Sequence, residues 1–400
     1  MERKEVRLCD VCSELSDGLH KAPKFIEKGE YIFVNAKNLY NGYILDNDPT
    51  KKTSHEEYLK YKKPLGKHTI LYSIDGTIGN IAKYRGEKCV LGKGACYLNC
   101  NPKIVVSSYL YYQLQSPHFK SYIHLMSTGS TIKHISLKTM REYVFELPSL
   151  TDQRRIASIL SSLDRKIELN NKINADLEEM AQAIFKNWFV DFEPFKDGKF
   201  VDSELGMIPE GWKVGTLTEI ASYMNGLAMQ KFPPENNEDS LPVLKIKELG
   251  QGFCGTDSDR CSCNIKDECK IHNGDVIFSW SGTLLVDVWC GGDCGLNQHL
   301  FKVTSKDYPK WFYYYWTKHH LQEFIHIAKD KAVTMGHIKR GHLEEAMVAI
   351  PDNDSMVKAH ELFEPILSKM ISLRLENSRL SLLRDTLLPR LMSGEIEVPQ

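Results

Sequence analysis

The chain has 400 residues, of which 42% are hydrophobic and 26% are charged, and its formal net charge is −1. These values are typical of a globular protein with two or three domains. No apolar run approaches the ~20 residues of a membrane span, and the first residues lack the apolar core of a secretory signal, so we expect a cytoplasmic location. Eleven cysteines, an odd number, favour reduced thiols.

Residues 1–150 have the pattern of a compact mixed α/β head. Residues 71–79 predict a strand, a tight turn and a second strand, and residues 109–123 are aromatic-rich and compatible with a helix. We expect these aromatic residues to pack in the core rather than to form a platform for bases. Residues 144–148 predict the strand that closes the head. With 22 Lys and Arg against 15 Asp and Glu, the segment has a net charge of +7.

Residues 151–199 predict a first helical arm, with Thr151 as its N-cap. Roughly 35 residues at ~1.5 Å each would form a rod of about 50 Å. Along the arm, steps of four and three residues alternate, which is the spacing of a heptad seam. The seam consists of Ile156, Leu160, Leu163, Ile167, Asn170, Asn174, Leu177, Ala181, Ile184 and Trp188.

Residues 200–352 predict a second head and residues 353–400 a second arm. Gly and Pro in residues 202–212 end the first helix, and Trp212 is expected to anchor the new head. Residues 200–350 contain 15 Lys and Arg against 20 Asp and Glu, a net charge of −5, so this head would need a local basic patch to bind a polyanion. Asp354 or Ser355 is the expected N-cap of the second arm, and Pro365 predicts a kink or the true start of its helix.

The two halves of the chain repeat each other. Residues 131–135 (Thr-Ile-Lys-His-Ile) return 203 residues later as residues 334–338 (Thr-Met-Gly-His-Ile), and the same offset relates Asn174 to Asn377. Neither arm can bury its seam alone, so we expect the two helices to pair. An antiparallel pair needs only short connections and places one head at each end. Asn174 and Asn377 would then mark the register as buried polar residues, or else lie solvated on the helix surface.

The predicted fold class is therefore α/β (α+β). Two similar globular domains are separated by two long helices that form an antiparallel coiled coil with pseudo-two-fold symmetry.

No catalytic or metal-binding signature stands out in the sequence. We find no P-loop, no dinucleotide-binding fingerprint and no paired-histidine metalloprotease motif. Cys9 and Cys12 form one C-x-x-C pair, and six further cysteines crowd the second head. Their spacing is irregular and the first head has no matching cluster, so we expect no zinc site. These patterns favour a non-catalytic protein.

Five phrases resemble the specificity subunit of a type I restriction–modification system. They are residues 153–157 (Gln-Arg-Arg-Ile-Ala), 188–194 (Trp-Phe-Val-Asp-Phe-Glu-Pro), 203–212, 387–396, and the loop 17–23 with its counterpart 225–231. The resemblance covers essentially the whole chain. One departure is that residues 352–356 lack the Gln-Arg-Arg-Ile run, which leaves the start of the second arm open.

The resemblance implies that each head is a target-recognition domain that reads one half of an asymmetric, interrupted site in double-stranded DNA. The helices would fix the gap and dock methyltransferase (modification) subunits, which restriction/translocase subunits join. Adenine methylation and ATP-dependent cleavage, with S-adenosylmethionine, ATP and Mg, would belong to those partners, and this chain would hold no cofactor. Half-sites one turn apart lie ~34 Å apart on B-DNA, within reach of such a rod.

Candidate DNA contacts lie in loops of both heads. Basic residues and a Gly-Ser-Thr turn suit phosphates, while Asn225 and Gln230 suit the edge of adenine. The alternatives are solvated loop side chains and, for the repeated Thr and His residues, a structural turn that recurs because the fold recurs. The candidates are His20, Lys21, Lys24, Gly129, Ser130, Thr131, Lys133, His134 and Lys138 in the first head, and Asn225, Gln230, Lys231, Thr334, His337, Lys339 and Arg340 in the second.

Two other functions stay open at this point. A standalone DNA-modifying enzyme would need a catalytic domain, for which the two duplicated units leave no residues. A structural adaptor could bridge two partner subunits without reading DNA, although the duplicated polar turns argue against it.

Overall fold

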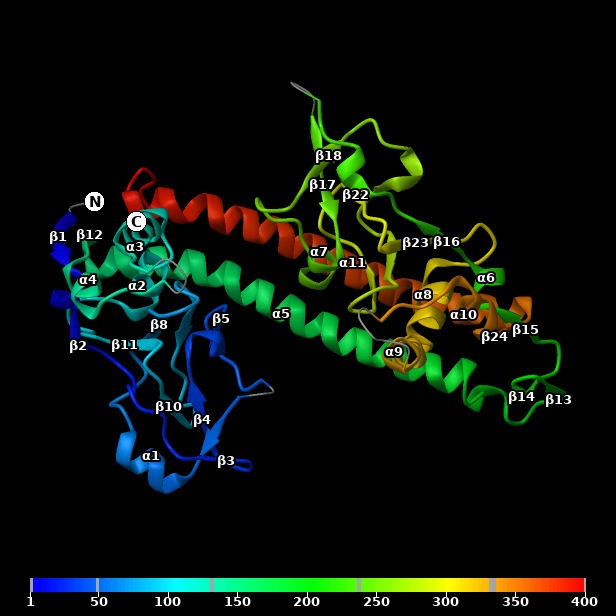
Figure 1. Ribbon diagram of the computed structural model, residues 1–400, viewed down its shortest axis with the longest axis horizontal. Helices are drawn as coiled ribbons and strands as arrows, with labels where there is room; N and C mark the ends of the chain where they lie inside the picture. The colour runs from blue at the N-terminus through cyan, green and yellow to red at the C-terminus, as the bar shows by residue number, and fades with distance from the viewer. Residues whose placement is uncertain (1–2, 48–49, 130–132, 236–238, 331–335, 399–400) are drawn as a thin grey trace. The chain divides into compact units, whose positions relative to one another are not determined.

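The chain forms two compact units, each with one head. The computed structural model describes residues 3–47, 50–129, 133–235, 239–330 and 336–398. The units are Met1–Lys166 with Leu380–Gln400, and Ile167–Arg379. Each unit includes part of both long helices, α5 (Leu150–Phe189) and α11 (Asn353–Ser393) (Figure 1). Within the described ranges, no helix combines the length and the apolar character needed to cross a membrane.

The first head is a mixed α/β structure. Its strands are β1 (Arg3–Arg7), β2 (Cys12–Asp17), β3 (Phe25–Ile26), β4 (Tyr31–Val34), β5 (Leu39–Tyr40), β6 (Tyr43–Ile44), β7 (Lys52–Thr53), β8 (Thr69–Ser73), β9 (Ile81–Lys83), β10 (Cys89–Leu91), β11 (Ala95–Cys100) and β12 (Val144–Pro148). Its helices are η1 (Leu8–Val11), η2 (Ala36–Asn38), α1 (His55–Tyr61), α2 (Ser107–Gln113), α3 (Pro117–Met126) and α4 (Leu137–Glu142).

The second head is built from a similar set of strands and helices. Its strands are β13 (Phe200–Ser203), β14 (Gly206–Pro209), β15 (Lys213–Thr216), β16 (Ser222–Asn225), β17 (Ser240–Leu244), β18 (Arg260–Ser262), β19 (Lys270–Ile271), β20 (Val276–Ser279), β21 (Leu285–Val288), β22 (Cys294–Leu296), β23 (Leu300–Thr304) and β24 (Met347–Ile350). Its helices are η3 (Glu193–Phe195), α6 (Leu217–Ile220), η4 (Met229–Lys231), α7 (Ile246–Gln251), η5 (Asp267–Cys269), α8 (Lys310–His319), α9 (Leu321–Asp330) and α10 (Arg340–Glu345).

The sheet topology of the two heads shows that the sequence repeat is a structural repeat. The antiparallel sheet β2-β11-β8-β9 corresponds strand for strand to β16-β23-β20-β21. The two-stranded pair β1-β12 corresponds to β15-β24. The smaller sheets, β10-β4-β7-β3 and β18-β17-β22-β19, differ at their edges but each contains one parallel pair, β4 with β10 and β17 with β22. The expected duplicated α/β fold is therefore confirmed.

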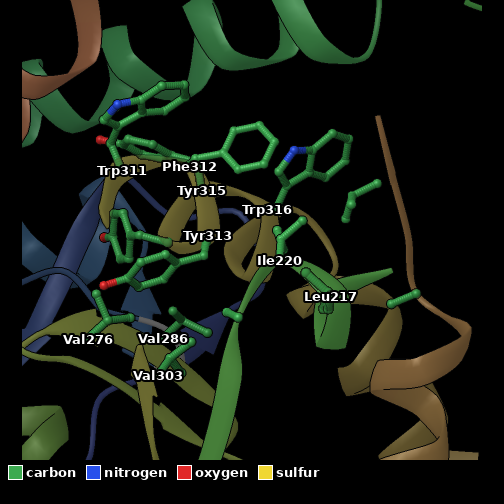
Figure 2. Close-up of a cluster of buried hydrophobic side chains, with 14 of the residues drawn as sticks. Leu217, Ile220, Val276, Val286, Val303, Trp311, Phe312, Tyr313, Tyr315 and Trp316 are labelled. Atoms are coloured by element: carbon green, nitrogen blue, oxygen red, sulfur yellow. The ribbon is translucent and has the colours of Figure 1, made fainter. Parts of the chain in front are cut away.

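Aromatic side chains fill the cores of both heads. Residues Trp311 to Thr317 of α8 are all buried, and Tyr109, Tyr111 and Tyr112 of α2 are buried likewise. Large rings of this kind bury 150–250 Å² each, roughly, and dominate core packing. Trp212 is 5% exposed and belongs to the same core, so its anchoring role is confirmed. Figure 2 shows the packing of Leu217, Ile220, Val276, Val286, Val303, Trp311, Phe312, Tyr313, Tyr315 and Trp316.

The two long helices pack antiparallel, as the need for short connections predicts. In the second unit, Asn170 of α5 bonds to Asn377 of α11 at 2.9 Å, and the rings of Phe185 and Phe363 lie 6.3 Å apart. The residue numbers rise along α5 while their partners fall along α11. In the first unit the hydrophobic core includes Leu160 of α5 together with residues of α11.

The N-caps differ from those expected, because the capping side chain is the first polar one after each closing strand. Ser149, rather than Thr151, caps α5: its Oγ accepts the N–H of Asp152 at 3.2 Å. Asp352, rather than Asp354 or Ser355, caps α11: its Oδ1 accepts the N–H of Ser355 at 2.7 Å.

Pro365 does not mark the start of the second helix. α11 begins at Asn353 and continues through Pro365 to Ser393. A proline inside a helix removes one internal hydrogen bond, but the turns before it are held by Ala359 and Phe363, which are both fully buried.

A polar layer crosses the helix pair in the second unit. Asn170 is 0% exposed, and its Nδ2 donates to Asn377 Oδ1 at 2.9 Å and to Glu376 Oε2 at 2.8 Å. Asn377 Nδ2 donates to Asn171 Oδ1 at 2.8 Å. Asn377 therefore marks the register, but its partner is Asn170 rather than Asn174. Asn174 lies one helical turn beyond Asn170 on α5, so it does not face Asn377 in this register.

Candidate nucleic-acid interface

Four polar turns of the first head are tied together by their backbones. They comprise residues 17–20, 74–76, 91–94 and 133–135, and we call them the first turn cluster. Four hydrogen bonds connect them: Leu19 N–H to Leu91 O (2.7 Å), Ile74 N–H to Gly94 O (3.0 Å), Gly76 N–H to Lys133 O (3.1 Å) and Ile135 N–H to Ile74 O (2.8 Å). The side chains at the tips of these turns thus belong to one surface of the head.

The second head builds the same frame from residues 225–228, 280–282, 296–299 and 336–338, the second turn cluster. Its bonds match those of the first: Leu227 N–H to Leu296 O (2.9 Å), Gly282 N–H to Gly336 O (3.0 Å) and Ile338 N–H to Trp280 O (3.1 Å). Residues 92–95 of the first head correspond to residues 297–300 of the second. In each segment the last N–H bonds to the first carbonyl: Ala95 N–H to Gly92 O, and Leu300 N–H to Asn297 O.

Gly18 and Gly226 explain why the loop phrases of the two heads match. A Cβ at Gly18 would lie less than 3.0 Å from the carbonyl oxygens of Leu91 and Gly92. A Cβ at Gly226 would lie equally close to the carbonyl oxygens of residues 296 and 297. Glycine is needed at both positions because the backbone of the neighbouring turn approaches too closely for any side chain.

The first turn cluster contains several of the predicted contact residues. His20 is exposed, and its Nε2 lies 3.0 Å from Asp17 Oδ2. Lys21 is exposed directly after it, and Lys133 is exposed in the last turn. His134 lies opposite Asp75, with Nδ1 4.0 Å from Oδ1.

Other predicted residues of the first head lie elsewhere or at its margin. Gly129 is exposed next to Thr128, whose backbone pairs with that of His134. The N–H of Lys24 bonds to Glu57 on α1 at 2.9 Å, and Lys138 lies on α4, where its Nζ is 3.8 Å from Glu142. Ser130 and Thr131 lie outside the described residues.

The second turn cluster is arranged similarly. Asn225 ends β16 and is exposed, and Gln230 and Lys231 are exposed on η4. His337 is exposed, with its ring 6.4 Å from that of Trp280. Lys339 and Arg340 form the start of α10, and Thr334 lies outside the described residues. The backbone frame accounts for the recurrence of the His motif, whereas contact between these side chains and DNA stays a prediction.

The second head also contains a cavity of about 600 Å³ beside its turn cluster. Sequence reasoning identified Gln230 in its wall but missed most of the other lining residues, which come from separate strands. No pattern in the sequence pointed to the turn at residues 297–300, whose equivalence to residues 92–95 follows from the matching backbone bonds. The cavity is lined by Met229, Gln230, Val243, Lys245, Ile246, Lys247, Asp259, Arg260, Asn297, Gln298 and His299.

Three cationic side chains give this cavity a local basic wall in an otherwise acidic head. Lys245 pairs with Asp259, and Lys247 Nζ lies 2.5 Å from Asp257 Oδ2. The hydrogen bond and charge of Asp257 raise the pKa of Lys247, so it is positively charged at neutral pH. Arg260 Nε donates to Ser240 Oγ at 2.7 Å.

A polar chain leads from the second turn cluster into the cavity. Ser281 Oγ lies 3.3 Å from His299 Nδ1, and His299 Nε2 lies 3.3 Å from Gln298 Nε2. In the first head, the residue equivalent to Gln298 is Lys93, whose Nζ lies 3.8 Å from Asp75. The two heads therefore present different side chains from the same backbone position.

Seven of the eleven cysteines are buried, and the other four are half-buried. All eleven are free thiols. Burial raises the pKa of Cys96 and of Cys100 to about 12, so both are neutral at physiological pH. In the part of the chain that the structure describes, no group of three or more His, Cys, Asp or Glu side chains is placed to hold a metal ion.

Two copies of one α/β head, each with a polar turn cluster, on a pair of antiparallel helices define a duplicated recognition protein. The family model described as "Type I restriction modification DNA specificity domain" matches residues 2–179 and 209–374. The chain therefore belongs to the DNA specificity subunits of type I restriction–modification systems.

Similar proteins carry the same description. The chain is 30% identical to the type I restriction enzyme MjaIX specificity subunit of Methanocaldococcus jannaschii, over 94% of this chain and 86% of that protein. It is 22% identical to the HindI specificity subunit of Haemophilus influenzae, over 98% and 99% of the two chains. A crystal structure of an S subunit from M. genitalium shares the fold, with a TM-score of 0.54 at 16% identity over 98% and 96%.

Proposed function

We propose that each turn cluster faces double-stranded DNA and reads one half of an asymmetric, interrupted site. The observation that carries this proposal is one backbone frame, built twice, that presents different side chains. Phosphate contacts set register while side chains that reach base edges set sequence. A constant backbone frame can make the phosphate contacts, while the side chains at the ends of its turns read the bases. Because these side chains differ between the two heads, we expect two different half-sites rather than a palindrome.

The long helices, in this proposal, set the gap between the half-sites and dock the methyltransferase subunits. Their continuity supports a rigid spacer, because α5 and α11 have 40 and 41 residues without interruption. Four exposed apolar side chains on the helices of the second unit are available for contact with such a partner. These are Leu169 and Met180 on α5, and Val357 and Leu362 on α11.

The chain works as one subunit of a type I complex, and we propose that it contributes no catalytic group. Adenine methylation with S-adenosylmethionine would then belong to methyltransferase subunits, and ATP- and Mg-dependent cleavage to restriction/translocase subunits. The naming of its relatives as specificity subunits supports this division. Incubation of the purified chain alone with DNA and these cofactors should give no turnover, and any methylation or cleavage would contradict it.

The decisive experiment is a methylome. The chain is co-expressed with a cognate methyltransferase subunit in a host that lacks DNA methylation, and the DNA is sequenced for modified adenine. A two-part motif with a fixed gap, absent without this chain, is the expected result. A stable complex that gives no motif would contradict sequence recognition and favour a structural adaptor.

A further inference from the structure

We propose that Gln298 selects the base at one position of the second half-site, with the edge of an adenine received at the cavity beside it. This inference rests on the proposed function and assigns a specificity-determining residue to it. Glutamine suits this role because its amide can donate to and accept from the N7 and N6 groups of adenine at the same time.

The backbone on both sides of Gln298 is held in place. Asn297 N–H donates to Leu244 O at 3.1 Å, and Leu300 N–H donates to Asn297 O at 3.0 Å. Asn297 Oδ1 accepts the N–H of His299 at 3.2 Å, which closes the turn. Gln298 therefore projects from a short, fully bonded turn after β22 rather than from a free loop, as base reading requires.

His299 acts as a positioning residue for the Gln298 amide. Its Nε2 lies 3.3 Å from Gln298 Nε2, and its Nδ1 lies 3.3 Å from Ser281 Oγ. The His299 ring also lies 6.1 Å from that of Trp280. These contacts restrict the rotamers of Gln298 before DNA binds, so less side-chain entropy is lost on binding.

The basic wall of the cavity supplies the phosphate contacts that base reading needs. Lys245 and Lys247 follow β17, and Arg260 begins β18, which pairs with β17. Asp259 is the one acidic residue of the lining and pairs with Lys245, while Asp257 pairs with Lys247. Three cations against these two carboxylates leave the wall with a local net charge of +1, in a head whose residues 200–350 carry −5.

The first head has a different residue at the position of Gln298, which supports a role of this position in base selection. Lys93 occupies the position of Gln298, and Gly94 replaces His299. Lysine suits the O6 and N7 acceptors of guanine rather than adenine. The same position therefore carries adenine chemistry in one head and guanine chemistry in the other.

The test is a methylome of the co-expressed complex with Gln298→Ala and, separately, Gln298→Lys. Gln298→Ala should relax one position of the second half-site, with discrimination there falling roughly 10- to 100-fold. Gln298→Lys should shift the preference at that position from adenine to guanine. The first half-site and the gap should not change in either variant.

Two control variants separate base reading from general binding. Gln251→Ala removes an exposed glutamine of the same head outside the cavity and should leave the motif unchanged. Lys247→Ala should weaken binding to all sequences alike and reduce its salt dependence. Thermal melting of each purified complex checks that it is folded.

The outcomes distinguish a failure of the proposed function from a failure of the role assigned to Gln298. If the wild-type complex gives no bipartite motif, the proposed function fails. If it gives a motif that both Gln298 variants retain unchanged, only the assignment of Gln298 fails. A uniform loss of methylation in folded Gln298 variants, with no change of sequence preference, would also overturn it.

Discussion

At the scale of single residues, the turn clusters depend on glycines that are required by distance rather than by backbone angle. Gly18 and Gly226 lie against carbonyl groups of the next turn, where no Cβ can fit. Each also donates its own N–H across the cluster, to Ala95 O at 3.2 Å and to Leu300 O at 3.1 Å. A side chain at either position would push apart the turns that present the contact residues.

Gly226→Ala should therefore destabilise the second head by about 1–3 kcal/mol, because a side chain forced into a packed site strains the backbone. Thermal unfolding of the purified complex measures the effect. Gly250→Ala is the matched control, since a Cβ there meets nothing within 4 Å and Gly250 lies on α7. Alanine in a helix is favoured over glycine, so that variant should be neutral or slightly more stable. Equal melting temperatures for both variants would contradict the steric argument.

Gln153, in the Gln-Arg-Arg-Ile phrase, bonds to three backbone groups from two separate segments. It is 1% exposed, and its amide accepts the N–H of Val106 at 2.8 Å. Its Nε2 donates to Ile104 O at 3.2 Å and to Pro148 O at 2.9 Å. The side chain thus ties the start of α5 to the segment before α2.

Gln153→Leu should cost about 3 kcal/mol of unfolding free energy, because it leaves buried backbone groups without partners. Chemical denaturation would measure this loss. Ser158→Ala, at an exposed position of the same helix, should change stability by less than about 0.5 kcal/mol. A loss below about 1 kcal/mol for Gln153→Leu would show that water replaces the amide.

At the scale of elements, the helix pair combines apolar seams with one polar layer. Apolar packing permits several registers, whereas the buried Nδ2 of Asn170 can reach both Asn377 and Glu376 in only one. Asn170, Asn377 and Glu376 make such a layer, with Asn171 at its edge. The layer therefore selects the alignment of α5 with α11, while the seams supply most of the stability.

A double-mutant cycle tests this layer. Asn170→Leu should destabilise the protein by about 1–3 kcal/mol, because it strands the polar groups of Asn377 and Glu376. Adding Asn377→Leu should recover part of that loss, since apolar groups then replace both partners. Denaturation curves of the two single variants and the double variant provide the coupling energy, and strictly additive effects would argue against a direct interaction.

At the scale of the whole molecule, the duplicated heads and paired helices form a two-site recognition protein. In the proposed function, the helices determine how far apart the half-sites lie. The head residues determine which bases are read, so gap and sequence are properties of different parts of the chain.

Inserting one heptad into both helices at facing positions, after Asn174 and after Ser372, should widen the gap and keep the bond between Asn170 and Asn377. Seven residues add about 10 Å, which corresponds to about three base pairs of B-DNA. The methylome should show unchanged half-sites with the longer gap. Inserting the heptad into one helix alone should abolish methylation, because it keeps the a/d spacing of that helix but displaces its contacts with the other helix by two turns. An unchanged gap in the double insertion would reject the spacer role.

The sequence by itself determined the duplicated frame, the long helices and their antiparallel pairing. The duplication follows from a recurring offset of about 203 residues, the pairing of the helices from heptad spacing, and their direction from the short connections that an antiparallel pair needs. The repeated glycine loop and the anchoring of Trp212 were also accessible, because the residue type itself signals the constraint.

Only the tertiary structure decided which residues meet. Asn170, and not Asn174, bonds to Asn377, because that partner depends on where two separate helices cross. The cavity joins Lys245, Arg260 and Gln298 because β17 pairs with β18 on one side and with β22 on the other. Strand pairing between distant segments leaves no periodic pattern in the sequence, so the cavity beside the second turn cluster could not be predicted from it.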